Sequence, residues 1–405
     1  MIKATRTQWI KFAVVLALYL IFLVWLRSWL GLVGVPFIFD AYITKKIPWT
    51  WWRKSKNRHV VTVMGWVDAI VFALVAVYFV NLYFFQNYVI PSSSLEKSLL
   101  TGDYLFVSKM SYGPRVPQTP LHMPLAQHTL PFFNCKSYLE HPQWDYKRVK
   151  GLGDVQLNDI VVFNFPAGDT VATGVPNDDV YRLSYGAGKE LAKPVDLASM
   201  TPEQQRVVYD YYYQLGREYL KENPQNFGEI ISRPVDRREN YVKRCVGLPG
   251  QTLEIKDRII YLDGKANKEP DNVQYRYLVK TKRPIPDDLA HELGISKEDM
   301  MMYYTDASVY NMPLTEKAKA GLLARKDIVV SIENTPADDA GGLYPLNMYK
   351  NWTTDNYGPV WIPKKGETVK LTLENLPVYE RPIHAYEGNE LAVKDGKIYI
   401  NGKET

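Results

Sequence analysis

The sequence predicts two N-terminal transmembrane helices followed by a mainly antiparallel β domain that carries inserted α/β segments. Two uncharged apolar runs occur before residue 86, separated by a basic, tryptophan-rich loop. No apolar run of that length follows, and short strand patterns alternate with turn residues. The 405 residues include 25 Gly, 26 Pro and 29 Tyr, a composition typical of β structure with many turns.

The first apolar run is Phe12–Leu26. It is short for a bilayer span, but flanking cations can snorkel and the apolar Leu30–Phe39 extends it, so we expect a helix over about residues 10–30. A cleaved secretion signal is the alternative. No small-x-small site follows, and the bulky Leu26–Trp29 argues against cleavage, so the helix is expected to be retained.

The second apolar run is Ala69–Phe85, which predicts a helix over about residues 66–86. The loop before it, residues 40–63, holds several lysines, arginines and tryptophans. Such a loop could be a nucleic-acid patch, but the positive-inside bias favours a cytoplasmic loop at the lipid headgroups, and no nucleic-acid partner is expected. Because this loop is more basic than the N-terminus, both termini are expected outside, and residues after 86 are expected to be extracytoplasmic.

Strand and helix patterns organise the rest of the chain. Asp103–Lys109 and Asp159–Phe165 predict buried strands, and Thr201–Glu222 predicts a helix with Thr201 as its N-cap. Leu253–Lys265 predicts two strands with a tight Asp263-Gly264 turn, and Leu391–Lys403 repeats this pattern.

The predicted domains follow from these patterns. They are a membrane anchor over 1–86, a β core over 87–265 with insertions at 114–150 and 168–235, and an inserted subdomain over 266–405 that ends in the repeated hairpin. The subdomain contains a helix-like Thr315–Ala324 and a strand-like Asp327–Ile332.

Cysteine and histidine give little indication of chemistry. The two cysteines, Cys135 and Cys245, could form a disulfide or remain thiols, and the sequence does not decide between these states. So few soft ligands argue against a metal site, and no cofactor is expected. The six histidines fall outside the predicted strands and the chain has no G-x-S-x-G, so a Ser-His triad is not favoured.

A serine–lysine pair is the better candidate. Ser92–Ser94 follow Pro91 just beyond the second apolar run, and Lys243 stands in the apolar stretch Tyr241–Gly250. A lysine on the apolar face of a strand would lose hydration, which would lower its pKa from ~10.4 toward neutrality and let it accept a serine proton. The alternative is that Lys243 and Arg244 form a solvated basic pair.

Three segments resemble motifs of the bacterial type I signal peptidase (leader peptidase) family. Ile90–Leu95 with Gly102-Asp103 is similar to the serine box P-S-x-S-M-x-P-T-L-x-x-G-D, and Asn158–Pro166 is similar to the G-D-I-V-V-F strand. Tyr241–Gly250 matches the lysine box Y-x-K-R-x-x-G-x-P-G nearly throughout. The resemblance implies a signal-peptidase-like fold and a Ser/Lys serine endopeptidase of the bacterial inner membrane, with its catalytic domain on the periplasmic side.

The resemblance also implies roles for individual residues. Ser94 would be the nucleophile, Lys243 the general base, and Ser92 with the backbone N–H of Ser94 the oxyanion donors. Substrates would be preproteins cleaved after a small-x-small motif, and the lipid bilayer would be the second partner. The residues expected to line the substrate pockets are Tyr88, Ile90, Leu95, Tyr241 and Val242.

The sequence departs from the family in two places. Leu95 and Lys97-Ser98 stand where the family has Met and Pro-Thr. The last family box, G-D-N-R-x-N-S-x-D-S-R, has no counterpart, and Thr354–Gly358 does not match it, which favours a C-terminally incomplete chain. The alternatives are a catalytically impaired or non-enzymatic membrane-tethered extracytoplasmic binding protein, and a different Ser/Lys protease.

Overall fold

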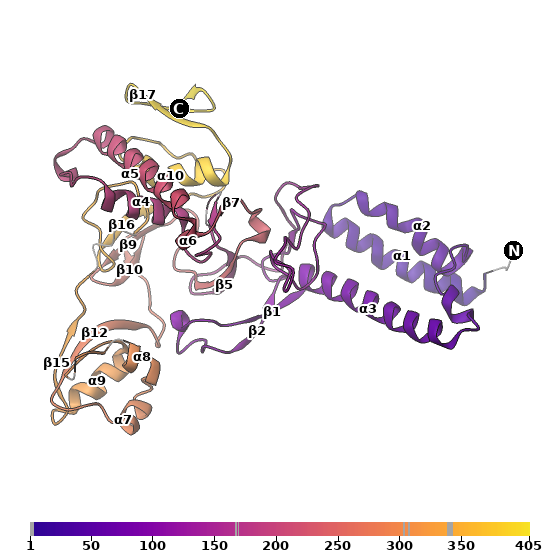
Figure 1. The fold of residues 1–405 in the computed structure, drawn as a ribbon, viewed down its shortest axis with the longest axis horizontal. Helices are drawn as coiled ribbons and strands as arrows, with labels where there is room; N and C mark the ends of the chain where they lie inside the picture. The colour runs from indigo at the N-terminus through magenta and orange to yellow at the C-terminus, as the bar shows by residue number, and fades with distance from the viewer. Residues whose placement is uncertain (1–3, 167, 169, 303, 307, 338–342) are drawn as a thin grey trace.

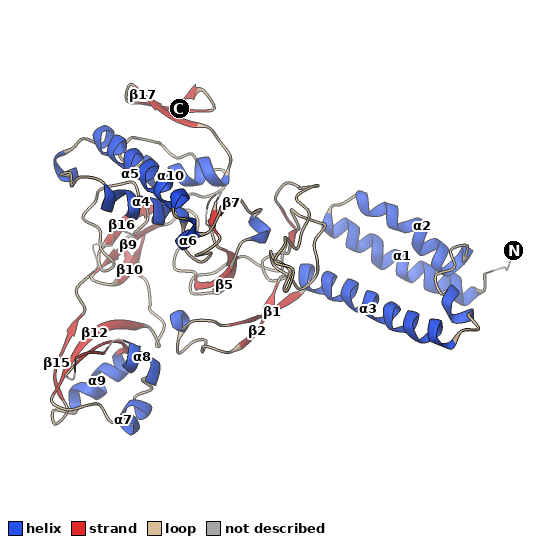
Figure 2. Ribbon diagram, viewed as in Figure 1, coloured by secondary structure: helices blue, strands red, loops and turns tan. Residues whose placement is uncertain are grey.

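The computed structural model describes residues 4–166, 168, 170–302, 304–306, 308–337 and 343–405. A helical bundle forms one end of the molecule, and a mixed body of short sheets and helices forms the other (Figure 1). The ribbon β1–β2 lies between the bundle and this body, and a separate unit around β12 and β15 projects from it (Figure 2). The helical and β parts therefore occupy different regions along the long axis.

The N-terminal bundle contains two helices that are long and apolar enough to cross a membrane, α1 (Arg6–Leu26) and α3 (Arg58–Tyr83). They start and end earlier than the expected 10–30 and 66–86. Short helical segments lie between them: η1 (Leu30–Gly34), α2 (Val35–Phe39), η2 (Asp40–Thr44) and η3 (Trp51–Lys54).

The expectation that Leu30–Phe39 extends the first helix is wrong. Arg27 adopts a left-handed conformation with φ 51° and ends α1, and the chain then folds back. The ring centre of Phe39 lies 6.3 Å from that of Trp9 and 5.4 Å from that of Phe12, near the start of α1. The sequence did not indicate this turn, because the segments before and after it are both apolar and the hydropathy is therefore similar on either side.

The fold-back also corrects the expected position of the N-terminus. Since α1 runs toward the β domain and the segment 30–44 returns, the start of α1 lies at the same end of the bundle as the basic loop. The β domain lies at the opposite end (Figure 1). The two termini therefore do not share one side of the bundle.

A small joint connects the bundle to the β domain. Leu26, Tyr83 and Val149 form a buried apolar cluster at the inner ends of α1 and α3. The indole Nε1 of Trp25 donates a hydrogen bond to the backbone oxygen of Lys150 at 3.3 Å. This joint fixes where the chain leaves α3 and begins β1.

The β domain consists of several small sheets in which the paired strands are antiparallel. Its strands are β1 (Phe85–Val89), β2 (Tyr104–Ser108), β3 (Arg115–Val116), β4 (Lys147–Arg148), β5 (Ile160–Asn164), β6 (Val171–Ala172), β7 (Ile230–Ile231) and β8 (Asn240–Arg244). They pair as β1–β2, β3–β4, β5–β8 and β6–β7. The strands predicted at 103–109 and 159–165 are present as β2 and β5, but the expected burial is wrong, because each lies in a two-stranded ribbon with exposed positions.

Two three-stranded meanders replace the two predicted hairpins. The first is β9 (Thr252–Lys256), β10 (Ile259–Leu262) and β11 (Lys265–Ala266), and the second is β17 (Leu391–Lys394), β18 (Lys397–Ile400) and β19 (Lys403–Glu404). The turn at Asp263-Gly264 is confirmed, but a second two-residue turn at Asp257-Arg258, with φ 49° and 75°, divides the first segment again. An Asp-Arg pair gives no strong turn signal, so the sequence did not indicate this turn.

A helical layer covers part of the β domain. It contains α4 (Val180–Leu191), η5 (Leu197–Ser199), α5 (Pro202–Glu222), α6 (Pro224–Phe227) and η6 (Val235–Arg237). The predicted N-cap is confirmed, because the hydroxyl of Thr201 accepts from the backbone N–H of Gln204 at 3.4 Å. A Cβ at Gly188 would lie 1.8 Å from the Tyr212 oxygen, so α4 and α5 approach as closely as only glycine allows.

The segment after residue 266 forms a unit with its own core and then returns to the β domain. The unit contains β12 (Gln274–Thr281), α7 (Asp287–Glu292), α8 (Lys297–Met302), β13 (Tyr304–Asp306), β14 (Val309–Thr315), α9 (Glu316–Ala324) and β15 (Val329–Asn334). The returning chain forms β16 (Tyr357–Trp361), which pairs with β9, then α10 (Leu376–Arg381) and η7 (Pro382–Tyr386). The domain limits at 86, 265 and 266 stay a prediction.

Candidate active site

Ser94 lies in the loop that joins β1 to β2, within the short helix η4 (Ser93–Leu95). Backbone hydrogen bonds close the base of this loop: Ile90 N–H donates to the Asp103 oxygen at 3.0 Å, and Gly102 N–H donates to the Ile90 oxygen at 2.9 Å. The Asp103 carboxylate accepts from the Leu100 N–H at 2.8 Å, which agrees with a structural turn residue. The loop is therefore anchored at its base and presents an exposed Ser94.

Lys243 reaches Ser94 from β8. In the β5–β8 ribbon Lys243 pairs with Val161, and its Nζ donates a hydrogen bond to the Oγ of Ser94 at 2.8 Å. The same Nζ lies 5.9 Å from the ring centre of Tyr241, two residues earlier on the same face. Two groups 149 residues apart in the chain are thus in direct contact.

The expected burial of Lys243 is wrong. Its side chain is exposed, because the ribbon that carries it has two strands and its neighbour, the Ser94 loop, is also exposed. Strand alternation predicted which side chains share a face, but it does not say whether anything covers that face.

Arg244 contacts the same loop and was not identified from the sequence. One guanidinium nitrogen donates to the hydroxyl of Ser98 at 2.9 Å, and the other donates to the backbone oxygen of Asn158 at 2.9 Å. Arg244 therefore ties the loop after Ser94 to the segment that leads into β5. The lysine-box pattern contained Arg244, but strand alternation placed its side chain on the face opposite Lys243. The long side chain of Arg244 nevertheless reaches around the edge of the ribbon to the Ser94 loop.

The other predicted site residues lie at different distances from the dyad. Ser92 and Ser93 precede Ser94 directly and are exposed, while Ile90 is buried at the base of the loop. Leu95, Tyr241 and Val242 are half-buried. Their roles in substrate binding stay predictions.

Tyr88 occupies a different environment. It lines a cavity of about 950 Å³ between α3, β1 and β2, and neither Ser94 nor Lys243 is among the residues that line this cavity. Burial raises the pKa of its phenol to about 12. Its assignment to the substrate pockets stays a prediction.

Polar and aromatic contacts hold the β5–β8 ribbon at both ends. At one end the Tyr112 hydroxyl donates to Asp159 at 2.6 Å, which lowers the pKa of the Asp159 carboxyl and raises that of Tyr112 to about 12. At the other end the ring of Tyr241 stacks on Phe165 with centres 4.5 Å apart. These contacts fix the position of Lys243 along the ribbon.

Cysteine and histidine take no part in this site. Cys135 is exposed, Cys245 is half-buried, and both are free thiols. His128 lies 3.0 Å from Glu239, and Nδ1 of His122 lies 3.1 Å from the Thr119 oxygen, both away from Ser94. Across the described part of the chain, no three His, Cys, Asp or Glu side chains gather as a metal site would require.

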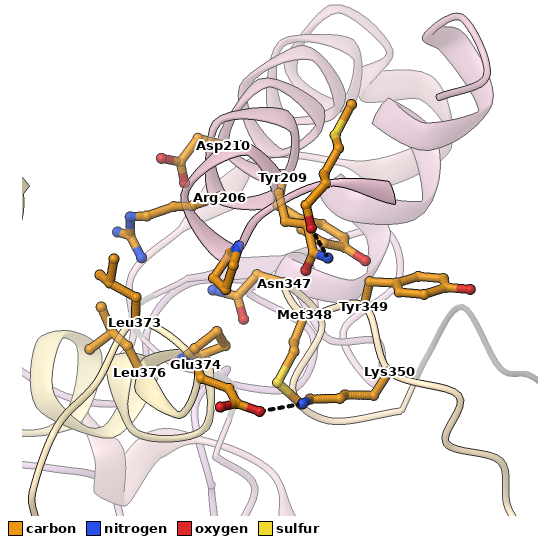
Figure 3. A pocket seen from close by; sticks show the side chains of 14 residues that line it. Arg206, Tyr209, Asp210, Asn347, Met348, Tyr349, Lys350, Leu373, Glu374 and Leu376 are labelled. Carbon is orange, nitrogen blue, oxygen red and sulfur yellow. Dashed lines mark hydrogen bonds and ion pairs between the residues drawn. The ribbon is translucent and has the colours of Figure 1, made fainter. Parts of the chain in front are cut away.

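A second, smaller cavity of about 180 Å³ lies between α5, residues 347–350 and α10 (Figure 3). At its edge Arg206 forms a bidentate ion pair with Glu380, at 2.6 and 2.9 Å, and Asn347 donates to the same carboxylate. Lys350 closes one side by binding Glu374 at 2.8 Å (Figure 3). The contacts of Arg206 and Asn347 with Glu380 connect α5 and residues 347–350 to α10, so the polar groups around this cavity hold the returning chain against α5.

Comparison with known proteins identifies the family. The family described as "Signal peptidase, peptidase S26" matches residues 63–303, which is more than half of the chain and includes both Ser94 and Lys243. The chain belongs to this signal peptidase family. Two apolar helices followed by a mainly antiparallel β domain are compatible with that membership.

Individual relatives support the same conclusion over shorter stretches. Signal peptidase I of Helicobacter pylori (strain ATCC 700392 / 26695) is 42% identical over 56 residues, which cover 14% of this chain and 18% of that protein. Signal peptidase I P of Bacillus subtilis subsp. natto is 27% identical over 103 residues, or 25% of this chain and 52% of that protein. Signal peptidase I of Rickettsia prowazekii (strain Madrid E) is 24% identical over 165 residues, which cover 37% of this chain and 56% of that protein.

The chain thus spans between about a fifth and just over half of the length of these relatives. No solved structure matches it.

Proposed function

We propose that this protein is a membrane-bound serine endopeptidase that removes signal peptides from exported preproteins after a small-x-small motif. The observation that carries the proposal is the 2.8 Å hydrogen bond between Nζ of Lys243 and Oγ of Ser94. The family's relatives, which are named signal peptidase I, support the reaction class.

In the proposed mechanism the neutral amine of Lys243 removes the proton of Ser94 as Oγ attacks the scissile carbonyl carbon. The resulting oxyanion accepts from the hydroxyl of Ser92 and the backbone N–H of Ser94. Lys243 then gives its proton to the leaving amine of the mature protein, and an acyl-enzyme remains. Water, deprotonated by Lys243, hydrolyses this ester and releases the signal peptide with Ser94 restored.

The bound preprotein has a second role in this proposal. Ser94 and Lys243 are exposed in the free protein. A substrate strand seated against Ile90, Leu95, Tyr241 and Val242 would cover them and exclude water. Burial favours the neutral amine that the mechanism needs, so substrate binding itself would complete the site.

The proposed location is the bacterial inner membrane, with α1 and α3 as spans and the β domain on the periplasmic side. The basic loop at the far end of the bundle supports this orientation through the positive-inside bias. Ser94 comes eleven residues after Tyr83, the last residue of α3, which limits its distance from the end of this proposed span, where the cleavage site of a preprotein would emerge.

The deciding experiment incubates purified protein in detergent with a preprotein and compares wild type with Ser94→Ala and Lys243→Ala. Both variants are expected to lose activity by roughly 10³-fold or more. Ser92→Ala is expected to lose roughly 10²- to 10³-fold through the missing oxyanion donor. Ser93→Ala, at the neighbouring exposed position, serves as the matched control and is expected to stay active.

Three outcomes would contradict the assignment. Undiminished cleavage by either Ser94→Ala or Lys243→Ala would exclude the dyad. Activity in Ser94→Ala together with its loss in Ser92→Ala would make Ser92 the nucleophile. Preprotein binding without any cleavage by the wild type would favour the membrane-tethered binding protein instead.

A further inference from the structure

The cavity of about 950 Å³ has two chemically different walls. One wall is mainly apolar and belongs to the last turns of α3, where Ala76, Val77 and Val80 line it, with Asn81 as a polar member. The other wall belongs to the β domain and carries Lys109, Arg115 and Arg148. An apolar wall beside a cationic wall is the chemistry of a site for an anionic amphiphile.

None of the three cations forms an ion pair within the described residues, although the charge of Asp236 attracts Arg115. Arg115 donates to the amide oxygen of Asn164 at 2.6 Å. Arg148 donates to the backbone oxygen of Gly113 at 2.7 Å and to the Tyr146 hydroxyl at 3.0 Å. Each guanidinium has five N–H donors, so both keep donors available. The ammonium of Lys109 lies 5.9 Å from the ring centre of Tyr88.

The charge balance of the cavity is positive. The lining residues include a fourth cation, Arg237, and one carboxylate, Asp236. Oδ2 of Asp236 accepts from Thr119 at 2.9 and 3.0 Å and lies 3.5 Å from Arg237, whereas its buried Oδ1 accepts no hydrogen bond. Burial, followed by repulsion from Arg115 and Arg148, lowers the pKa of Lys109 to about 8. Cations that repel one another in a recess are stabilised when an anion enters it.

We propose that this cavity binds the phosphate of an anionic phospholipid, with the phosphate against Lys109, Arg115 and Arg148 and the acyl chains along α3. The inference rests on the proposed membrane placement of α3. The Tyr78 hydroxyl binds the Pro120 oxygen at 3.0 Å, which holds the loop that forms part of the cavity beside the end of α3. The cavity therefore lies at the level where a bilayer presents its headgroups.

The apolar wall favours a lipid over free phosphate. A free phosphate would use the cations alone and leave the α3 surface in water. The volume lies within the roughly 300–1,000 Å³ of ordinary ligand sites, so a glycerophosphate headgroup and the first methylenes of its chains fit.

The test measures thermal unfolding of the full chain in detergent micelles by tryptophan fluorescence, without preprotein. The probes are dioctanoyl-phosphatidylglycerol, dioctanoyl-phosphatidylcholine and inorganic phosphate at matched concentrations. Phosphatidylglycerol is expected to raise the unfolding midpoint of the wild type most. Lys109→Met is expected to weaken its apparent affinity about tenfold or more, the usual cost of one charge-assisted hydrogen bond.

Matched variants distinguish specific binding in the cavity from nonspecific electrostatic attraction of the protein to anionic lipid. Lys150→Met removes an exposed lysine near the same joint but outside the cavity, and is expected to respond like the wild type. Arg148→Met, whose side chain is also exposed, provides a second test if Lys109→Met does not fold, and is expected to weaken binding in the same direction.

Three results would overturn the proposal: equal responses of Lys109→Met, Arg148→Met and Lys150→Met, no response of the wild type to phosphatidylglycerol, or an equal response to inorganic phosphate. Cleavage is measured separately. The lipid site can therefore fail while Ser94 and Lys243 remain active, and a failed dyad leaves the lipid result intact.

Discussion

The region around Ser94 and the unit over residues 274–334 are built in opposite ways. The unit packs helices on a four-stranded sheet around a core in which Val279, Met312 and Leu322 are fully buried. Within 90–103, the loop that carries Ser94, Ile90 is the buried residue, and Lys243 lies on a two-stranded ribbon. The site is thus held by individual hydrogen bonds, whereas the unit is held by apolar burial.

This difference implies that stability and activity respond to different substitutions. Removing atoms from a filled core costs the lost burial and leaves a cavity. Removing a hydrogen bond from an exposed loop costs little stability but can displace a reacting group. Three predictions sharpen the contrast, from the largest effect to the smallest.

Met312→Ala is expected to destabilise the unit by about 2–5 kcal/mol, because Met312 is fully buried. Hydrogen exchange followed by mass spectrometry should show faster exchange across 274–334, with little change in the Ser94 loop and in preprotein cleavage. Val330→Ala removes a side chain that is 61% exposed on the same sheet and serves as the control. A loss of cleavage as large as that of Ser94→Ala would mean that the two regions are not separable.

Arg244→Met is expected to slow cleavage by roughly tenfold while leaving the unfolding midpoint nearly unchanged, because it frees the Ser98 end of the loop. Ser98→Ala breaks the same contact from the other partner. If that contact is responsible, the double variant should be no slower than Arg244→Met alone. Additive losses would show that Arg244 acts through Asn158 instead.

The smallest expected effect is on the pH dependence of the stability of the unit over residues 274–334. Hydrogen bonds from Arg325 and Arg283 hold the pKa of the Asp327 carboxyl below its ordinary value of 3.8. Its contribution to stability is therefore present above pH ~4 and is lost as the pH falls through the folded-state pKa. Asp327→Asn should slightly lower the unfolding midpoint of the unit at pH 7 and remove this contribution to its acid sensitivity. An identical pH profile for both proteins would contradict the role of this ion pair.

The residues in the serine and lysine segments could be predicted from sequence because their pattern is local. The resemblance to the family's serine and lysine boxes pointed to Ser94 and Lys243, and the helix signals at Thr201 predicted α5 closely. The contact between Ser94 and Lys243 depends instead on how two distant segments pair. The sequence offered it only as a hypothesis, whereas the structure measures it at 2.8 Å.

The features that sequence reasoning missed depend on tertiary surroundings. Exposure of Lys243 follows from the width of its sheet, which a strand pattern does not encode. The three cations proposed to bind the phosphate in the large cavity come from two segments, one with Lys109 and Arg115 and one with Arg148, so no short window of sequence contains all three. The reversal at Arg27 requires a left-handed residue other than glycine, which carries no compositional signal.

The reversal at Arg27 also bears on how the chain could enter a membrane during synthesis. Tyr19 binds the Gly31 oxygen at 2.5 Å, and the close approach at Gly31 and Gly34 lets α1 and the segment 30–44 form a helical hairpin. Both ends of that hairpin lie on the side of the basic loop, so it could insert as one element without carrying any polar terminus through the lipid. In that case α3 would start the translocation of the chain, and the polar β domain after it would be translocated across the membrane.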